Sequence, residues 1–419
     1  MNIKFLLSTA LIATSFGTFA QDANTTYAIT GDGNGDFMWM NIRKVDISSG
    51  KIVQDVYQRE KTKFLMMDAS TKQPVEQTLN RNGQVYTAPV HPTATMVAAA
   101  AYDKNHDKLF FTPMRIGELR WLDLNAKGDA QKFYTVSTSP LNSNESLVDE
   151  ANHFTRMVIG ADGNGYAVTN DANRLIRFTT GKKVTVTDLG NLIDDESNKG
   201  VSIHNKCSSW GGDMIADAYN KLYIISANHY VFVVDLDTRV AKHVGIISGL
   251  PANYTTNGAA VDKDGAIVVA SANTFAGYYK FKLNDLAAVK IEGSDMVYNA
   301  SDLANGNLLL QKEADAARNF GADNFRPVVP VITPNAHVSP NPVTAGEFKV
   351  YFDGQEAGKY NITLTDLSGK AVMNRVVNVT AKTQVEAVQL SSKMAKGMYM
   401  VKVTDASNKF IFTERIVVQ

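Results

Sequence analysis

The chain has 419 residues, of which 44% are hydrophobic and 20% charged, a composition typical of a folded globular protein long enough for two or three domains. Its 42 basic and 42 acidic residues give a formal net charge of +0, which leaves no electrostatic footprint for an anionic membrane and excludes nucleic acid as a partner. Because Cys207 is the single cysteine, disulfides within the chain cannot hold the fold, and hydrophobic cores and sheet pairing must do so.

The first 20 residues have the pattern of a secretory signal peptide. Lys4 gives a positive start, residues 5–16 are mostly apolar, and small residues lead to Ala20. The apolar run is too short to span a bilayer, and no later run approaches the ~18 apolar residues that a spanning helix needs. We therefore expect cleavage near Ala20, export from the cytoplasm, and no transmembrane segment.

Residues 21–312 are predicted to form a β-propeller, because one strand pattern recurs along them. A strand of small residues ends in an acidic turn, and a bulkier strand follows. The four turns are Asp103–Asn105, Asp162–Gly165, Asp217–Asn220 and Asp262–Gly265. Two more strands follow each hairpin, and four antiparallel strands repeated every ~45–60 residues are typical of propeller blades. The length of this region predicts about six blades.

The two ends of this region are predicted to complete one blade together. Residues 27–30, 40–47 and 51–58 match the second, third and fourth strands of a blade that lacks its first strand. Residues 298–311 would help to close the ring against the N-terminal strands, which removes exposed sheet edges. Residues 60–92 match no blade and are either a long insertion or a degenerate blade.

Residues 313–332 are predicted to be a linker, because strand alternation stops and prolines appear. Residues 333–419 then contain about seven short strands with polar turns, which predicts a small immunoglobulin-like β-sandwich. Its motifs, in chain order, are Pro340-Asn341-Pro342, Asp366-Leu-Ser-Gly-Lys370, Gly397-Met-Tyr-Met-Val-Lys-Val403 and a short terminal strand. This order resembles the type A C-terminal sorting domain of the type IX secretion system of Bacteroidota.

The resemblance implies a destination for the protein. In that family the C-terminal domain directs passage through the outer-membrane translocon, so the implied partner is the translocon, contacted through residues 333–419. The implied location is the outer-membrane surface or the medium, after transit through the periplasm. Relatives often lose the domain by cleavage, and their cargo is then anchored to surface polysaccharide or released. This chain ends on Gln419 rather than on the lysine common among relatives, which bears on processing more than on recognition.

A ligand face is predicted on the propeller. Loops that enter the first strands and loops that join second to third strands emerge on one face around the axis, and aromatic and amide groups there suit a glycan or a peptide. The predicted face consists of Trp210, Tyr254, Asn257, Asn299, His153, Arg156, Asn170, His229 and Asn273. In the alternative interpretation each polar residue only satisfies its own loop, because Asn is common in turns.

A metal site is a second hypothesis. Six-bladed lactonases and related propeller hydrolases hold one divalent ion on the axis, and Asp213, Asn257 and Asn299 occupy comparable entry positions here. Oxygen ligands of this kind would select Ca²⁺ or a similar cation. However, one carboxylate is a small ligand set, and no catalytic residue can be assigned. We therefore expect a binding or interaction module rather than an enzyme; the alternative is a metal-dependent propeller hydrolase or lactonase.

Overall fold

The chain folds into two compact units, residues 1–327 and 328–419. The computed structural model describes residues 24–33, 35–138, 140–141, 147–294, 297–319, 337–344, 346–352, 355–366, 370–381, 384–391, 394–407 and 410–419. The expected signal peptide, residues 1–20, lies outside the described residues, as do residues 320–332 of the expected linker. Each unit is described by itself.

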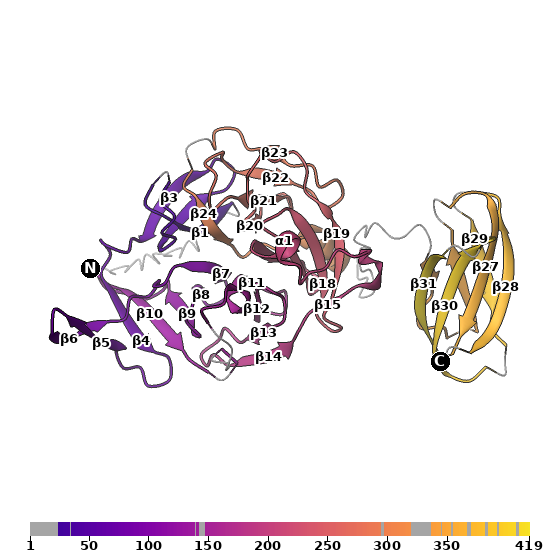
Figure 1. Ribbon diagram of the computed structural model, residues 1–419, viewed down its shortest axis with the longest axis horizontal. Coiled ribbons are helices and arrows are strands. Elements are labelled where there is room, and N and C mark those ends of the chain that lie inside the picture. Colours follow the sequence, from indigo (N-terminus) through magenta and orange to yellow (C-terminus); the bar gives the residue numbers. More distant parts are fainter. Residues whose placement is uncertain are drawn as a thin grey trace, which may run out of the picture. The chain divides into compact units, whose positions relative to one another are not determined.

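The first unit is a β-propeller (Figure 1). Five sheets each contribute one inner strand at the axis: β7 (Val97–Asp103), β11 (Phe154–Ile159), β16 (Asp213–Ala216), β20 (Gly258–Val261) and β24 (Ala300–Ala304). Each inner strand lies beside the next, and β24 lies beside β7, so the ring is closed. The prediction of a propeller is confirmed. The estimate of about six blades is wrong, since the described residues form five.

Three further strands complete each blade outward from the axis. The second strands are β1 (Thr25–Thr30), β8 (Lys108–Pro113), β12 (Gly165–Thr169), β17 (Lys221–Ile225) and β21 (Ile267–Ala270). The third strands are β2 (Asn41–Asp46), β9 (Leu119–Asp123), β13 (Leu175–Phe178), β18 (Tyr230–Asp235) and β22 (Tyr279–Phe281). The fourth strands are β3 (Lys51–Tyr57), β10 (Gln131–Val136), β14 (Val186–Gly190), β19 (Val240–Ile246) and β23 (Val289–Lys290).

Residue size explains why these strands form a ring. The inner strands crowd at the axis and carry small buried residues such as Ala100 and Ala259. The channel that they line has a volume of 10 Å³, about the space of one water molecule. Bulky residues on the outer strands pack one blade against the next, as where the Phe110 and Phe178 rings lie 5.1 Å apart. The first two strands of each blade are buried on both faces and are mostly apolar on both sides.

The two ends of the propeller region pair with each other and close the ring, as predicted. β24 pairs antiparallel with β1, with Tyr27 opposite Ala304 and Ala28 opposite Leu303. One blade therefore takes its inner strand from residues 300–304 and its outer strands from the start of the propeller.

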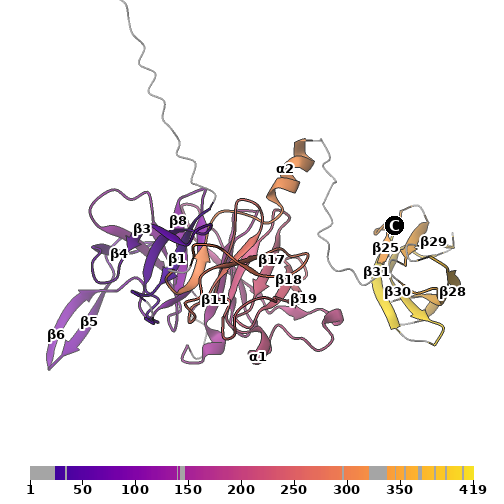
Figure 2. The same ribbon diagram turned by 90° about the horizontal axis from the view of Figure 1, so that it is seen from above.

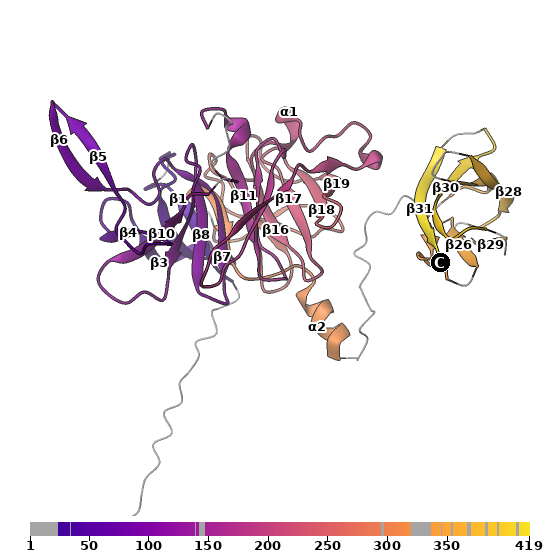
Figure 3. The same cartoon turned by 90° about the horizontal axis from the view of Figure 1, so that it is seen from below.

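Residues 60–92 are an insertion and not a blade, which explains the overestimated blade count. β4 (Phe64–Asp68) pairs parallel with β10 at the edge of one blade. β5 (Glu76–Arg81) and β6 (Gln84–Pro89) form a separate two-stranded hairpin that projects from the ring (Figures 2 and 3). A second edge strand, β15 (Ile193–Asp194), pairs parallel with β19 of another blade.

The acidic turns of the sequence repeat have one structural role. At the end of each inner strand the side chain accepts backbone N–H groups of the following turn, as Asp217 does from Tyr219 and Lys221. The fifth blade has Asn305 at this position, and its Oδ1 accepts from the N–H of Asn307 at 3.2 Å. Carboxylate and amide oxygens favour such turns because they replace a backbone acceptor.

Short helices lie in the loops, and one helix follows the ring. The loop helices are η1 (Glu150–Asn152), η2 (Glu196–Asn198) and α1 (Lys206–Ser209). The longer helix, α2 (Gln311–Asn319), follows the closing strand β24 after residues 305–310. Residues 313–319, expected to belong to an irregular linker, are therefore helical.

The second unit is a sandwich of seven strands in two sheets, in agreement with the prediction. One sheet contains β25 (His337–Ser339), β26 (Glu347–Tyr351) and β29 (Val385–Gln389). The other contains β28 (Ala371–Val379), β27 (Gly358–Thr365), β30 (Gly397–Asp405) and β31 (Phe410–Val418). Phe348, Ile362 and Val401 are buried in one core between the sheets, because alternate residues of each strand face inward.

The Pro-Asn-Pro motif holds the last strand of the sandwich. The Asn341 amide donates to the carbonyl of Arg415 at 2.7 Å and accepts from the N–H of Val417 at 3.0 Å. Val343 adds a backbone bond from its N–H to the carbonyl of Val417 at 2.7 Å. Asn341 thus pairs with β31 as a neighbouring strand would.

Candidate functional site

The predicted ligand face and α2 lie on opposite sides of the ring. α1 belongs to the loop that enters β16, and Figures 2 and 3 place it on the side of the ring away from α2. Trp210 ends α1, donates from Nε1 to the carbonyl of His204 at 3.1 Å, and lies under the ammonium of Lys206. Its indole is therefore already engaged by its own loop.

Arg156 joins two blades and does not point to a ligand. It lies on β11, is fully buried, and donates to the carbonyls of Gly211, Thr169, Asn170 and Ser209. Gly211 and Ser209 belong to the entry loop of the next blade. Burial lowers the pKa of Arg156 to about 10, so the guanidinium stays charged at neutral pH.

The neighbouring predicted residues are also engaged within their loops. The Asn170 amide accepts from the N–H of Gly211 at 2.7 Å and donates to the carbonyl of Glu150 at 3.1 Å. His153 is buried, with Nε2 lying 2.9 Å from the carbonyl oxygen of Leu147. These contacts favour the interpretation that the polar groups satisfy the loops.

The same holds in the blade that contains β20. Tyr254 is buried and donates its hydroxyl to the carbonyls of Val269 and Gly277, while His229 Nε2 contacts the Tyr254 carbonyl. Asn273 accepts from the hydroxyls of Ser271 and Thr255. Burial raises the pKa of the Tyr254 hydroxyl well above its usual range, so this hydroxyl remains a donor.

The structure does not assemble the predicted metal ligands into a cation site. Asp213 Oδ2 accepts N–H groups from Ala259 at 2.6 Å and Leu303 at 3.4 Å, and Oδ1 accepts from Met214 at 2.7 Å. These donors present positive charge to the carboxyl group, the opposite of what a cation needs. The Oδ1 atom of Asn257 accepts a hydrogen bond from the N–H of Ala272. No group of three or more His, Cys, Asp or Glu residues in the described part of the chain is placed to hold a metal ion.

Asn299 differs from the other predicted residues. It is 2% exposed, and neither amide atom has a hydrogen-bond partner among the described residues. An unsatisfied buried amide is costly, and Asn299 does not line the cavity described below.

A buried pair of carboxyl groups at the axis was not predicted. Asp302, on β24, accepts the N–H of Ala100 at 3.0 Å and hydrogen-bonds to Asp213. Both residues are fully buried. Burial, and for Asp302 also the neighbouring carboxylate, raises the pKa of each group. The alignment of Asp302-Leu303-Ala304-Asn305 with the earlier inner strands was the available signal for this residue.

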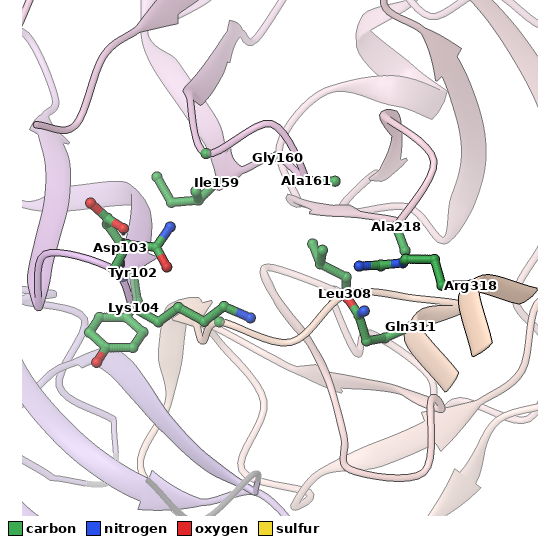
Figure 4. A pocket seen from close by; sticks show the side chains of 13 residues that line it. Tyr102, Asp103, Lys104, Ile159, Gly160, Ala161, Ala218, Leu308, Gln311 and Arg318 are labelled. Carbon is green, nitrogen blue, oxygen red and sulfur yellow. Dashed lines mark hydrogen bonds between the residues drawn. The ribbon is translucent and has the colours of Figure 1, made fainter. Parts of the chain in front are cut away.

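A cavity of 290 Å³ opens on the other face, where the first strand of each blade turns into the second. We call it the turn-face cavity (Figure 4). Its lining residues come from three hairpin turns, the segment after β24 and α2: Tyr102, Asp103, Lys104, Asn105, Ile159, Gly160, Ala161, Gly163, Ala218, Gly306, Leu308, Gln311 and Arg318. None of the residues predicted for the ligand face lines it.

Two cationic side chains enter the turn-face cavity. Lys104 comes from the β7–β8 turn and Arg318 from α2, and Figure 4 shows them reaching inward from opposite sides. Asp103, the carboxyl group in the lining, is turned away and contacts His106 Nδ1 at 2.6 Å and the N–H of Asn105 at 2.9 Å. The cavity therefore offers positive charge together with neutral polar groups.

Among solved structures the similar chains include propellers at low identity. PorZ of Porphyromonas gingivalis, a surface component of the type IX secretion system, is 15% identical to this chain, with a TM-score of 0.32. The aligned region covers 94% of this chain and 51% of the PorZ chain. This chain thus spans about half the length of PorZ. Virginiamycin B lyase of Staphylococcus aureus is 11% identical, with a TM-score of 0.33 and coverages of 94% and 96%. The Swd1 propeller domain of Myceliophteria thermophila is 12% identical, with a TM-score of 0.32 and coverages of 64% and 87%. None of these likenesses says what this chain binds.

No curated protein matches the sequence. Within the described residues, no helix has both the length and the apolar character needed to cross a bilayer.

The family comparison concerns the sandwich. Residues 337–419 match the family described as the secretion system C-terminal sorting domain, and the match runs from β25 to the end of the chain. The motifs have structural roles within it: Asn341 holds β31, and Asp366 accepts the N–H of Lys370 in the turn before β28. Residues 337–419 are therefore a C-terminal sorting domain of the type IX secretion system, and the chain is a cargo of that system with a β-propeller ahead of its sorting domain.

Proposed function

We propose that this protein is a binding module, exported to the cell surface or the medium, whose propeller takes a small ligand in the turn-face cavity. The observation that carries the proposal is the cavity itself, 290 Å³ in volume and lined by polar groups from several blades. Sites for small molecules are concave and have a few convergent polar groups. Several blades meeting at one cavity is also how propellers assemble sites from distant parts of the sequence.

The backbone supports this location. The turns that line the cavity are held by side-chain caps, such as Asp217 on Tyr219 and Lys221. The cavity walls are thus preorganised, which lowers the entropic cost of binding. The entry-loop face, by contrast, has most of its predicted polar groups engaged in loop contacts.

Blocking the cavity tests the proposal. Ala161 is exposed at the cavity wall, so Ala161→Trp fills the cavity without disturbing a core. The matched control is Ala287→Trp, at an exposed position that does not line the cavity. The purified chain and both variants are applied to glycan and peptide arrays, and thermal melts confirm that each variant is folded. We expect ligands of the unmodified chain and of the control to be lost from Ala161→Trp. Ligands that bind all three proteins equally would show that the binding site is elsewhere.

A further inference from the structure

We propose that the ligand of the turn-face cavity is an acidic carbohydrate of about monosaccharide size, whose carboxylate or sulfate group lies between Lys104 and Arg318. This inference rests on the proposed function, since it names the class of ligand for the same cavity.

Lys104 is directed over the cavity by its neighbour in the ring. A Cβ at Gly306 would lie 2.9 Å from Lys104 Cδ and 3.0 Å from its Cβ. The lysine stem therefore lies across the bare backbone of Gly306, which keeps the ammonium on the cavity side. Figure 4 shows this ammonium and the Arg318 guanidinium entering the same space.

Neither cation is neutralised by a carboxylate within the cavity. Lys104 has no ion-pair partner among the described residues. Arg318 contacts Asp315 at 3.3 Å on the exposed surface of α2, and Asp315 also accepts from the Gln311 amide at 2.8 Å. Asp103 is committed to His106 and its own turn. An anion placed between the two cations gains attraction from both.

The rest of the lining indicates a polyhydroxylated body for the anion. Asn105 and Gln311 offer amide groups, and the half-buried Gly163 leaves its backbone open to a ligand. A volume of 290 Å³ is at the lower end of the ~300–1,000 Å³ of small-molecule sites. Arginine binds carboxylate and sulfate in a bidentate manner, and lysine adds a point charge. An acidic monosaccharide combines these requirements in one molecule.

Calorimetry on the purified chain tests the inference with defined probes. Glucuronate, galacturonate, N-acetylneuraminate and galactose 6-sulfate are the acidic sugars, galactose is the neutral probe, and inorganic sulfate is the simple anion. We expect at least one acidic sugar to bind at least about tenfold more tightly than galactose and than sulfate. We also expect its affinity to fall between about 50 mM and about 500 mM NaCl, because screening weakens the charge contacts.

Charge variants identify the residues. Lys104→Gln and Arg318→Gln are each expected to weaken the acidic sugar by about tenfold or more, while galactose binding stays unchanged. Lys263→Gln is the matched control, because Lys263 follows Asp262 just as Lys104 follows Asp103 but does not line the cavity. All three positions are exposed, and thermal melts check that folding is retained.

The outcomes separate the two proposals. Neutral sugar or inorganic sulfate binding as tightly as every acidic sugar would overturn the acidic-carbohydrate assignment, as would unchanged affinity in both charge variants. Such results leave the cavity as a binding site if Ala161→Trp still abolishes binding. If Ala161→Trp leaves all binding intact, the binding site is elsewhere and both proposals fail.

Discussion

Asp302 hydrogen-bonds to Asp213, and the two carboxyl groups hold four of the five inner strands together at the axis. Asp213 lies on β16 and accepts N–H groups from β20 and β24, while Asp302 lies on β24 and accepts one from β7.

This pair predicts a loss of stability as pH rises. The folded pKa values are raised above the ordinary carboxyl value of ~3.9, to about 8 for Asp213, so the folded state binds protons more tightly than the unfolded state. The contribution is present at low pH and is lost as pH rises through the folded pKa, by about 1.4 kcal/mol per unit of pKa shift. We expect the free energy of unfolding to fall between about pH 5 and about pH 9.

Asp302→Asn replaces one of the two coupled carboxyl groups by an amide that does not titrate. Denaturant melts at several pH values should show a flatter profile for this variant than for the unmodified chain. Asp237→Asn, at an exposed site, is the control and should keep the original slope. A variant profile as steep as that of the unmodified chain would contradict the assignment of the proton to this pair.

Arg156 is predicted to be essential for contact between two blades. Arg156→Met removes the donors of four backbone carbonyls, and each buried acceptor left without a partner costs about 1–3 kcal/mol. We expect a loss of at least about 3 kcal/mol in urea unfolding. Arg177→Met, at an exposed position on β13, should change stability by less than about 0.5 kcal/mol. Equal effects of the two substitutions would rule out a special role for Arg156.

Gly212 is predicted to be irreplaceable at the entry to β16. It has φ of +88°, and a Cβ there would lie 1.9 Å from the carbonyl oxygen of Ile225. Gly212→Ala should therefore cost more than about 4 kcal/mol or prevent folding. Gly265 has a similar φ of +82° but no atom within 4 Å of an added Cβ, so Gly265→Ala should cost only about 1–2 kcal/mol. The difference between the two melts isolates the steric contact from the backbone strain.

Removing residues 332–419 is predicted to stop export without unfolding the propeller. The two units have separate cores, so the truncated chain should accumulate in the periplasm with the strand content of a folded ring. Cell fractionation and circular dichroism measure the two effects. The full-length Lys263→Gln chain is the control and should be exported normally. Normal secretion of the truncated chain would show that the sandwich is not needed for recognition.

The repeat of small strand, acidic turn and bulky strand was enough to predict the fold and its closure. Asp103, Asp162, Asp217 and Asp262 mark equivalent turns, because a hairpin of this kind needs a side-chain acceptor at that point. The blade number could not be obtained from length, because residues 60–92 add length without adding an inner strand.

The candidate site was less predictable. The same polar residue types occur in a loop whether they bind a ligand or the backbone, so the sequence could not show that Arg156 and Asn170 bind backbone groups. The turn-face cavity depends on α2 and on the bare backbone at Gly306. Neither feature produces a motif that can be recognised in the sequence. Its two cations are about 200 residues apart in sequence, so only the closed ring and α2 bring Lys104 and Arg318 together.

The pairing of β24 with β1 sets an order of events for a protein that crosses a membrane. When the N-terminus emerges first, one edge of β1 stays unpaired until residues 300–304 have also emerged. The propeller then has every strand it needs before the first strand of the sorting domain, which begins at His337, has emerged. The propeller can therefore close before the sorting domain is complete.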